Sequence, residues 1–91
     1  MPEDYFELKV RASSNARKVG SFVARSIFED KNLEVRAVGA AAINQALKAI
    51  AIANGWTGPR GVFLAAIPAF TEVDGNDGTR ITAMTFRVVR L

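Results

Sequence analysis

Hydrophobic and polar residues alternate in two short stretches near the start of the chain. Phe6, Leu8 and Val10 are separated by polar residues, and a second alternation covers residues 33–38. A period of two is typical of a strand with one buried face. Between these stretches, apolar residues recur three or four positions apart and predict a helix over residues 16–30. A strand, a helix and a second strand in so short a span predict a βαβ unit with parallel strands.

An Ala-rich segment follows. We expect a turn at Gly39 and then a helix that ends at Asn54-Gly55, because Ala and Leu favour helices and Asn or Gly often follows a helix end. At about 100° per residue, one face of this helix is apolar and comprises Ile43, Ala46, Leu47, Ile50 and Ala53. The opposite face comprises Asn44, Gln45, Lys48 and Ile52. An Ile on a polar face suggests a covered surface, such as a two-fold subunit interface.

The remaining segment predicts two more strands. Gly and Pro residues mark a loop over residues 55–61. Residues 62–69 are nearly all apolar and predict a well-buried third strand that ends at Pro68. Two Asp-Gly pairs within residues 71–79 predict a hairpin turn before a fourth strand over residues 80–90. The predicted order β-α-β-α-β-β is an α+β fold, a two-layer sandwich of a four-stranded mixed sheet and two helices, in a single domain spanning residues 1–91.

Composition narrows the classes of function. The 91 residues are 49% hydrophobic and 23% charged, which is typical of a folded domain. The chain contains no Cys and no His, so thiolate chemistry is excluded and the commonest general base and metal ligand are missing. We therefore expect neither an enzyme nor a bound metal or cofactor. The net charge of +3 permits an anionic partner without requiring one.

Targeting and membrane-spanning segments are not expected. Residues 1–4 are not followed by an apolar run, which argues against a signal peptide. The longest apolar runs are far shorter than a membrane span. The sequence therefore predicts a cytoplasmic protein with no membrane partner.

Most hydroxyl and carboxyl groups have structural interpretations. Ser13 and Ser14 have no His to activate them, and with Asn15 they are expected to cap the first helix. Residues 74–78 faintly resemble a calcium-binding loop, but the twelfth position of the pattern is Thr85 rather than Glu. We interpret that segment as the tip of a hairpin.

The basic residues point to anion binding. Arg17 and Lys18 fall in the first turn of the first helix, where cations oppose the helix dipole. That placement is reasonable if a phosphate docks there, and the alternative is a pair of ordinary solubilising charges. Asn44 and Lys48 stand one turn apart and either hold a phosphate or a base edge, or face water. Arg60 and Arg80 flank the loops next to the third and fourth strands. Trp56 either stacks on a base or covers the core.

Two runs of residues resemble a known family. Residues 44–49 read Asn-Gln-Ala-Leu-Lys-Ala after Gly39-Ala40, and residues 67–71 read Ile-Pro-Ala-Phe-Thr. With these runs, the chain from Phe6 almost to its end resembles the stage V sporulation protein S family, which is bacterial, cytoplasmic and tied to sporulation control. The resemblance implies an Alba-like fold of the order β-α-β-α-β-β.

Alba proteins bind DNA and RNA as dimers, through the loop after the first strand, the start of the second helix and the last hairpin. Together with the basic residues above, this resemblance gives a candidate nucleic-acid site of Ser13, Ser14, Asn15, Arg17, Lys18, Asn44, Lys48, Arg60 and Arg80. The chain departs from the Alba pattern at residues 39–42, which are small rather than basic, and at an acidic hairpin. Few phosphates would then be neutralised. The leading hypothesis is a homodimeric nucleic-acid-binding regulator of modest affinity. The alternative is a regulatory dimer that docks a protein without nucleic acid.

Overall fold

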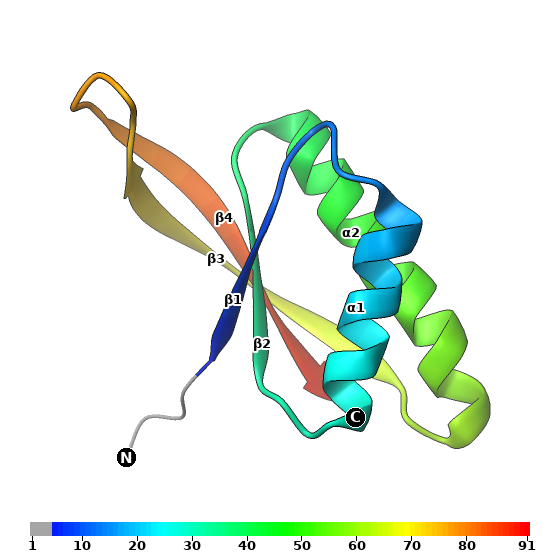
Figure 1. Cartoon of the computed structure of the whole chain (residues 1–91). Helices are drawn as coiled ribbons and strands as arrows, with labels where there is room; N and C mark the ends of the chain where they lie inside the picture. The colour runs from blue at the N-terminus through cyan, green and yellow to red at the C-terminus, as the bar shows by residue number, and fades with distance from the viewer. Residues whose placement is uncertain (1–4) are drawn as a thin grey trace, which may run out of the picture.

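A computed structural model describes residues 5–91, and the expectation about residues 1–4 lies outside this range. The elements are β1 (Phe6–Val10), α1 (Ala16–Phe28), β2 (Leu33–Ala37), α2 (Ala40–Thr57), the short 3-10 helix η1 (Gly58–Arg60), β3 (Leu64–Asp74) and β4 (Arg80–Arg90). The predicted α+β order β-α-β-α-β-β is confirmed (Figure 1).

The four strands form one mixed sheet in the order β1-β2-β4-β3. β1 and β2 are parallel, with Phe6 opposite Leu33 and Val10 opposite Ala37, as the βαβ interpretation predicts. β4 is antiparallel to both β2 and β3, so the last strand of the chain occupies a central position. Both helices pack on one face of the sheet, and no helix within residues 5–91 covers the other face (Figure 1).

The core lies between the sheet and the two helices. The alternation predicted for β1 and β2 buries Val10, Leu33 and Val35, each at most 2% exposed, against Val23 and other helix residues. Burying one such side chain contributes about 1.5–3 kcal/mol. Small residues of α2 such as Ala46, fully buried, allow this helix to approach the sheet closely.

The two helices meet at a glycine. A Cβ atom added to Gly20 of α1 would lie 2.7 Å from Cγ2 of Ile52 on α2. Ile52 is therefore half-buried inside the same chain, in the space left by the missing side chain of Gly20. The contact with α1 thus accounts for an Ile on the polar face of α2, and a subunit interface at Ile52 stays a prediction.

Two predicted boundaries are wrong. α2 does not end at Asn54-Gly55 but continues to Thr57, and the Asn54 side chain instead accepts a hydrogen bond of 3.0 Å from the Leu64 N–H. β3 does not end at Pro68 but continues to Asp74. Proline is tolerated because β3 is an edge strand, in which the N–H groups that face away from β4 make no ladder hydrogen bond.

β3 is not the well-buried strand that its apolar sequence predicts. Ile67 is 54% exposed and Phe70 is 76% exposed. The strand lies at the sheet edge, and its second half forms one arm of a long hairpin that extends beyond both helices (Figure 1). An exposed apolar edge results.

Candidate nucleic-acid interface

Three chain connections lie at the same end of the sheet (Figure 1): the β1–α1 loop, the β2–α2 turn and the β3–β4 hairpin. This placement follows from the strand directions. β1 and β2 are parallel, and β3 runs in the same direction as β2 because both are antiparallel to β4. The carboxyl ends of β1, β2 and β3 therefore all lie at the same end of the sheet, and a chain connection follows each of them there.

The β1–α1 loop is held by three hydrogen bonds that involve side chains. Ser14 Oγ accepts one of 2.8 Å from the Arg11 N–H, and Asn15 Oδ1 accepts one of 3.0 Å from the Lys18 N–H. Asn15 is thus the N-cap of α1, as its residue type predicts. Ser14 closes the preceding turn instead, and Ser13 precedes the cap position, so their predicted capping role is wrong. Gln45 Nε2 of α2 donates the third bond, of 2.8 Å, to the Ser14 carbonyl.

Both helices present polar or basic residues near this loop. Arg17 and Lys18 lie exposed in the first turn of α1, which contains no acidic residue. Asn44 and Lys48 lie exposed one turn apart on α2. Because Gln45 bonds to the loop, these two helix surfaces are continuous through residues 13–15. The start of α2 is capped only by Gly39, at φ 88°, so no side chain occupies its first N–H groups.

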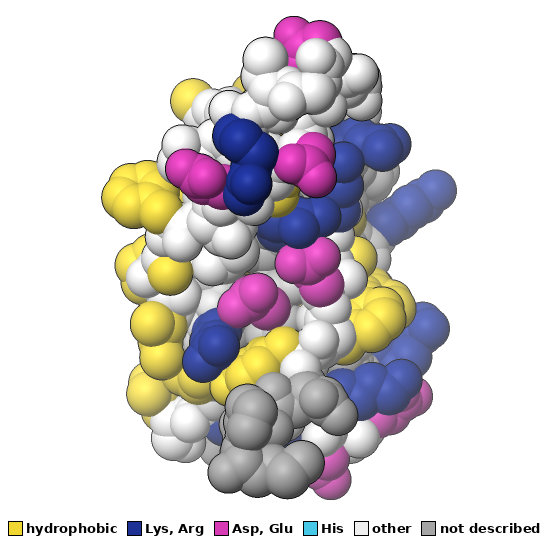
Figure 2. Space-filling view, turned by 90° about the vertical axis from the view of Figure 1, so that its left-hand side faces the viewer, with side chains coloured by type: hydrophobic (Ala, Val, Ile, Leu, Met, Phe, Trp, Pro, Cys, Tyr) yellow, Lys and Arg dark blue, Asp and Glu magenta, His cyan; other side chains and the backbone are white. Residues whose placement is uncertain are grey.

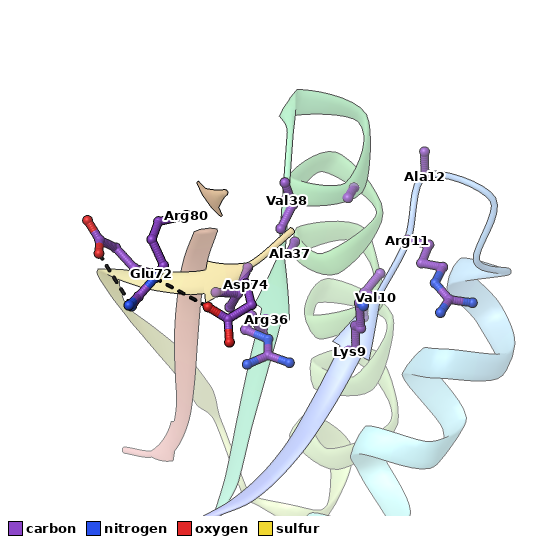
Figure 3. A pocket seen from close by; sticks show the side chains of 12 residues that line it. Lys9, Val10, Arg11, Ala12, Arg36, Ala37, Val38, Glu72, Asp74 and Arg80 are labelled. Carbon is purple, nitrogen blue, oxygen red and sulfur yellow. Dashed lines mark ion pairs between the residues drawn. The ribbon is translucent and has the colours of Figure 1, made fainter. Parts of the chain in front are cut away.

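A groove of about 510 Å³ lies between the ends of β1 and β2 and the hairpin (Figure 3). Lys9 and Arg11 line it from β1 and the residue after it, and Arg36 lines it from β2. Lys9 is the register partner of Arg36 in the parallel pair. Arg36 is also held by Glu7, with Nη1 3.2 Å from Oε1. The groove therefore has a basic wall formed by two neighbouring strands.

The hairpin supplies an acidic wall on the other side of the groove. Arg80 lies between Glu72 and Asp74 (Figure 3), with nitrogen–oxygen distances of 3.4 and 3.5 Å. Its charge is thus offset by two carboxylates. At the tip, the Thr79 hydroxyl and then the Thr79 N–H donate hydrogen bonds to Asp77 and lower the pKa of that carboxyl below its ordinary value of 3.8. The tip therefore stays negative at neutral pH.

Lys and Arg side chains without an ion pair are concentrated at this end. Within residues 5–91, ion pairs involve Lys31, Arg36, Arg80, Arg87 and Arg90. The cations left without one are Lys9, Arg11, Arg17, Lys18 and Lys48 near the groove and the loop, and Arg25 and Arg60 elsewhere. Figure 2 shows positive side chains gathered beside the hairpin end, at the upper right, and hydrophobic ones along the left-hand edge.

A family model matches almost the whole described chain. The model of stage V sporulation protein S covers residues 6–91. The chain belongs to this family. The resemblance inferred from residues 39–49 and 67–71 is confirmed, and membership of the stage V sporulation protein S family supports a sporulation-related role.

Residues 44–49, which carry part of the family resemblance, have different structural roles. Asn44 and Lys48 face solvent, Gln45 holds the β1–α1 loop, and Ala46 and Ala49 are fully buried. Leu47, which periodicity predicts in the core, is 45% exposed. In this stage V sporulation protein S domain, one short run therefore builds core, loop tether and exposed surface together.

Two predicted contacts lie away from the candidate interface of this family member. Arg60 is in η1, at the end of the molecule opposite the hairpin (Figure 1), where its guanidinium carbon lies 5.1 Å from the centre of the Phe28 ring. Trp56 is near the same end and is 61% exposed, so it does not cover the core. The sequence predicts that Arg60 lies in a loop beside the third strand. That loop precedes the start of β3, whereas the hairpin follows the end of β3, so the two lie at opposite ends of the sheet.

Sequence reasoning missed Lys9, Arg11 and Arg36. The signal was present, because these residues occupy the polar positions of two alternating strands that were predicted to be parallel. Within residues 5–91, no helix is both long and apolar enough to cross a membrane. In the same part of the chain, no group of three or more acidic side chains is arranged to hold a metal ion.

Proposed function

We propose that this protein is a homodimeric regulator that binds nucleic acid at the end of the sheet where its unpaired cations gather. The single observation that carries the proposal is this concentration: five of the cations without an ion pair in residues 5–91 surround the groove and the β1–α1 loop (Lys9, Arg11, Arg17, Lys18 and Lys48). Phosphate contacts of Lys and Arg provide most of the affinity for nucleic acid, independently of sequence. No catalytic role is part of the proposal.

The same surface limits the affinity. Glu72 and Asp74 neutralise Arg80, and the β2–α2 turn consists of small residues. Each phosphate contact contributes a slope of about −0.9 in log affinity against log salt for duplex DNA and about −0.7 for single strands. Full use of the five cations by one protomer therefore corresponds to a slope of roughly −4 to −5 on a duplex.

An apolar surface supports the dimer. Asn54 bonds to Leu64, so the face of α2 that carries Asn54 points toward β3, and Leu47 lies two turns earlier on that same face. Phe70 of β3 is 76% exposed and points to the side of the sheet that carries the helices, as Leu64 and Ala66 do. Ile67, 54% exposed, points to the opposite side, and Phe63, also 54% exposed, lies just before β3. Patches of this kind on a soluble domain commonly mark an interface. A second copy on this face would double the number of cations available to one nucleic acid.

The test is fluorescence anisotropy with labelled duplex DNA, duplex RNA and single-stranded RNA at two salt concentrations. We expect binding with a slope equivalent to several phosphate contacts on at least one polymer. The triple variant Arg17→Ala, Lys18→Ala, Lys48→Ala should bind more weakly and with a shallower slope. Lys31→Ala, which removes an exposed Lys paired to Glu29 at the other end, is the matched control. Absence of binding at low salt would refute the proposal and favour a dimer that docks a protein.

A further inference from the structure

The C-terminal halves of α1 and α2 enclose a second groove, of about 380 Å³, at the end of the molecule opposite the hairpin. It is lined by two small side chains, the exposed Ser21 and the buried Ala24, and by two aromatic side chains, Phe28 and Trp56. Ala24 is 5% exposed, whereas Phe28 is 43% and Trp56 is 61% exposed. Two large rings are thus held open to solvent beside two small side chains.

The groove follows from the packing of the two helices. Gly20, Ala24 and Phe28 are spaced four residues apart on α1, and Ile52 and Trp56 are spaced four apart on α2. Ile52 fills the space above Gly20, which brings the helix backbones close together. One turn further on, Trp56 meets Ala24, which is too small to cover the indole. The side chains of this chain therefore leave an apolar gap that a ligand can fill.

The rim of this groove is positively charged. Arg25 lines it, and the guanidinium of Arg60 lies over the Phe28 ring. Neither arginine has an ion pair with any residue in 5–91. The one carboxylate that lines the groove, Glu29, is 3.1 Å from Lys31 Nζ, so its charge is offset.

We infer that this groove docks an acidic segment of another protein that inserts one large apolar side chain between Phe28 and Trp56. Aromatic and Arg side chains dominate the binding energy of protein interfaces when they surround a desolvated pocket. The apolar gap selects a bulky anchor such as Leu, Phe or Trp. The two unpaired arginines select Asp and Glu beside that anchor and disfavour a basic segment.

A single-stranded nucleic acid is the less favoured occupant. A base would stack on Trp56, but the neighbouring groove surface is apolar and gives no hydrogen-bond partner for base edges beyond the Ser21 hydroxyl. Of the five cations proposed to bind phosphates, Lys9 and Arg11 line the groove beside the hairpin, Arg17 and Lys18 lie in the first turn of α1, and Lys48 lies midway along α2. The docking site is thus independent of the proposed nucleic-acid interface, and either one can fail without the other.

A displayed library of random peptides tests the inference. Peptides are selected on the full chain alone, and the enriched peptides are then tested for binding to the double variant Arg25→Glu, Arg60→Glu. We expect the enriched peptides to combine one large apolar residue with flanking Asp or Glu. Their binding should change the fluorescence of Trp56, which is the only Trp in the chain. The double variant should bind them at least about tenfold more weakly, in the range of interface hot-spot losses.

Three further measurements make the result decisive. Ser21→Leu, which fills the groove from an exposed position, should abolish peptide binding without loss of the fold as judged by circular dichroism. Arg17→Glu reverses a charge at the other end of α1 and should leave peptide affinity unchanged. Enrichment of basic peptides, or of peptides that bind the double variant equally well, would overturn the inference. So would single-stranded RNA that changes Trp56 fluorescence in the parent chain but not in the double variant.

Discussion

Gln45 of α2 donates a hydrogen bond of 2.8 Å from its side-chain amide to the main-chain oxygen of Ser14 in the β1–α1 loop. The two residues are 31 positions apart, and the bond is partly buried. It joins the loop that precedes Arg17 and Lys18 to the helix that carries Lys48. One amide side chain therefore sets the relative position of two basic surfaces that the sequence treats separately.

Removing this tether should loosen the loop. Gln45→Ala should cost about 1 kcal/mol of unfolding free energy, because a partly buried hydrogen bond is lost. Chemical denaturation gives this value, and hydrogen exchange should show faster exchange at the Lys18 amide. Asn44→Ala, an exposed neighbour on the same helix, serves as the control and should change unfolding free energy little. Equal stability of both variants would show that the bond contributes nothing.

Gly20→Ala should destabilise the protein by roughly 1–3 kcal/mol, the usual range for overpacking. The added Cβ would lie 2.7 Å from Cγ2 of Ile52 and 3.0 Å from the Ala49 carbonyl oxygen. Replacing Ile52 with Ala in the same chain should recover part of the loss, since it removes the Cγ2 contact but keeps the Ile52 Cβ position, which lies 2.9 Å from the added atom. Thermal unfolding of the single and double variants measures this coupling.

Gly55→Ala is the matched control for that experiment. Gly55 also lies in a helix, but a Cβ there meets nothing within 4 Å. The substitution should therefore stabilise the fold by about 0.4–1 kcal/mol, through the reduced entropy of the unfolded chain. A stabilising Gly20→Ala would contradict the close helix contact.

The pKa of Asp77 depends on Thr79. Thr79→Val removes the hydroxyl that donates to Asp77 Oδ1 at 2.7 Å, so the pKa of Asp77 should rise toward its ordinary value of 3.8. Because the folded pKa is the lower one, the interaction stabilises the hairpin above the unfolded pKa and is lost as pH falls through the folded pKa. An NMR titration of the carboxyl carbon measures the shift. Thr82→Val on β4 keeps these hydrogen bonds and should leave the Asp77 titration unchanged.

Freeing Arg80 should strengthen the proposed nucleic-acid binding. Glu72→Gln combined with Asp74→Asn removes both carboxylates that hold Arg80 and deletes two negative charges beside the groove. Affinity at low salt should rise several-fold, and the salt slope should steepen by about one phosphate contact. Anisotropy titrations compare the affinity of this double variant with that of Glu29→Gln, which removes a carboxylate far from the groove. Unchanged affinity would exclude the hairpin from the interface.

The proposed dimer depends on the apolar face shared by α2 and β3. Leu47→Glu places a charge on that face and should yield a monomer by light scattering coupled to size-exclusion chromatography. Trp56→Ser, at the other end of the helices, should leave the mass unchanged. A parent chain that is already monomeric at high concentration would refute the dimer.

The elements of this fold follow from local pattern, whereas their limits and the site depend on tertiary contacts. Alternation and Ala content predict both helices, all four strands and the parallel pair. Asn54 fails as a helix end because its amide bonds to Leu64, and Pro68 fails as a strand end because β3 is an edge. Ile52 appears misplaced in the sequence until Gly20, 32 positions away, is seen to receive it. The sequence proposes Lys18 and Lys48 as site residues, which stays a prediction, whereas the pairing of Lys9 with Arg36 requires the strand register.

The central position of β4 has a consequence for the synthesis of this chain on the ribosome. Residues 80–90 form β4, which separates β2 from β3, so the sheet has a gap at this position until β4 is synthesised. Before β4 is made, β2 has a neighbouring strand only on its β1 side, and β3 has no neighbouring strand to pair with. We therefore expect that nascent chains that stop before β4 do not reach the native state, and that folding is completed only once residues 80–90 have left the exit tunnel.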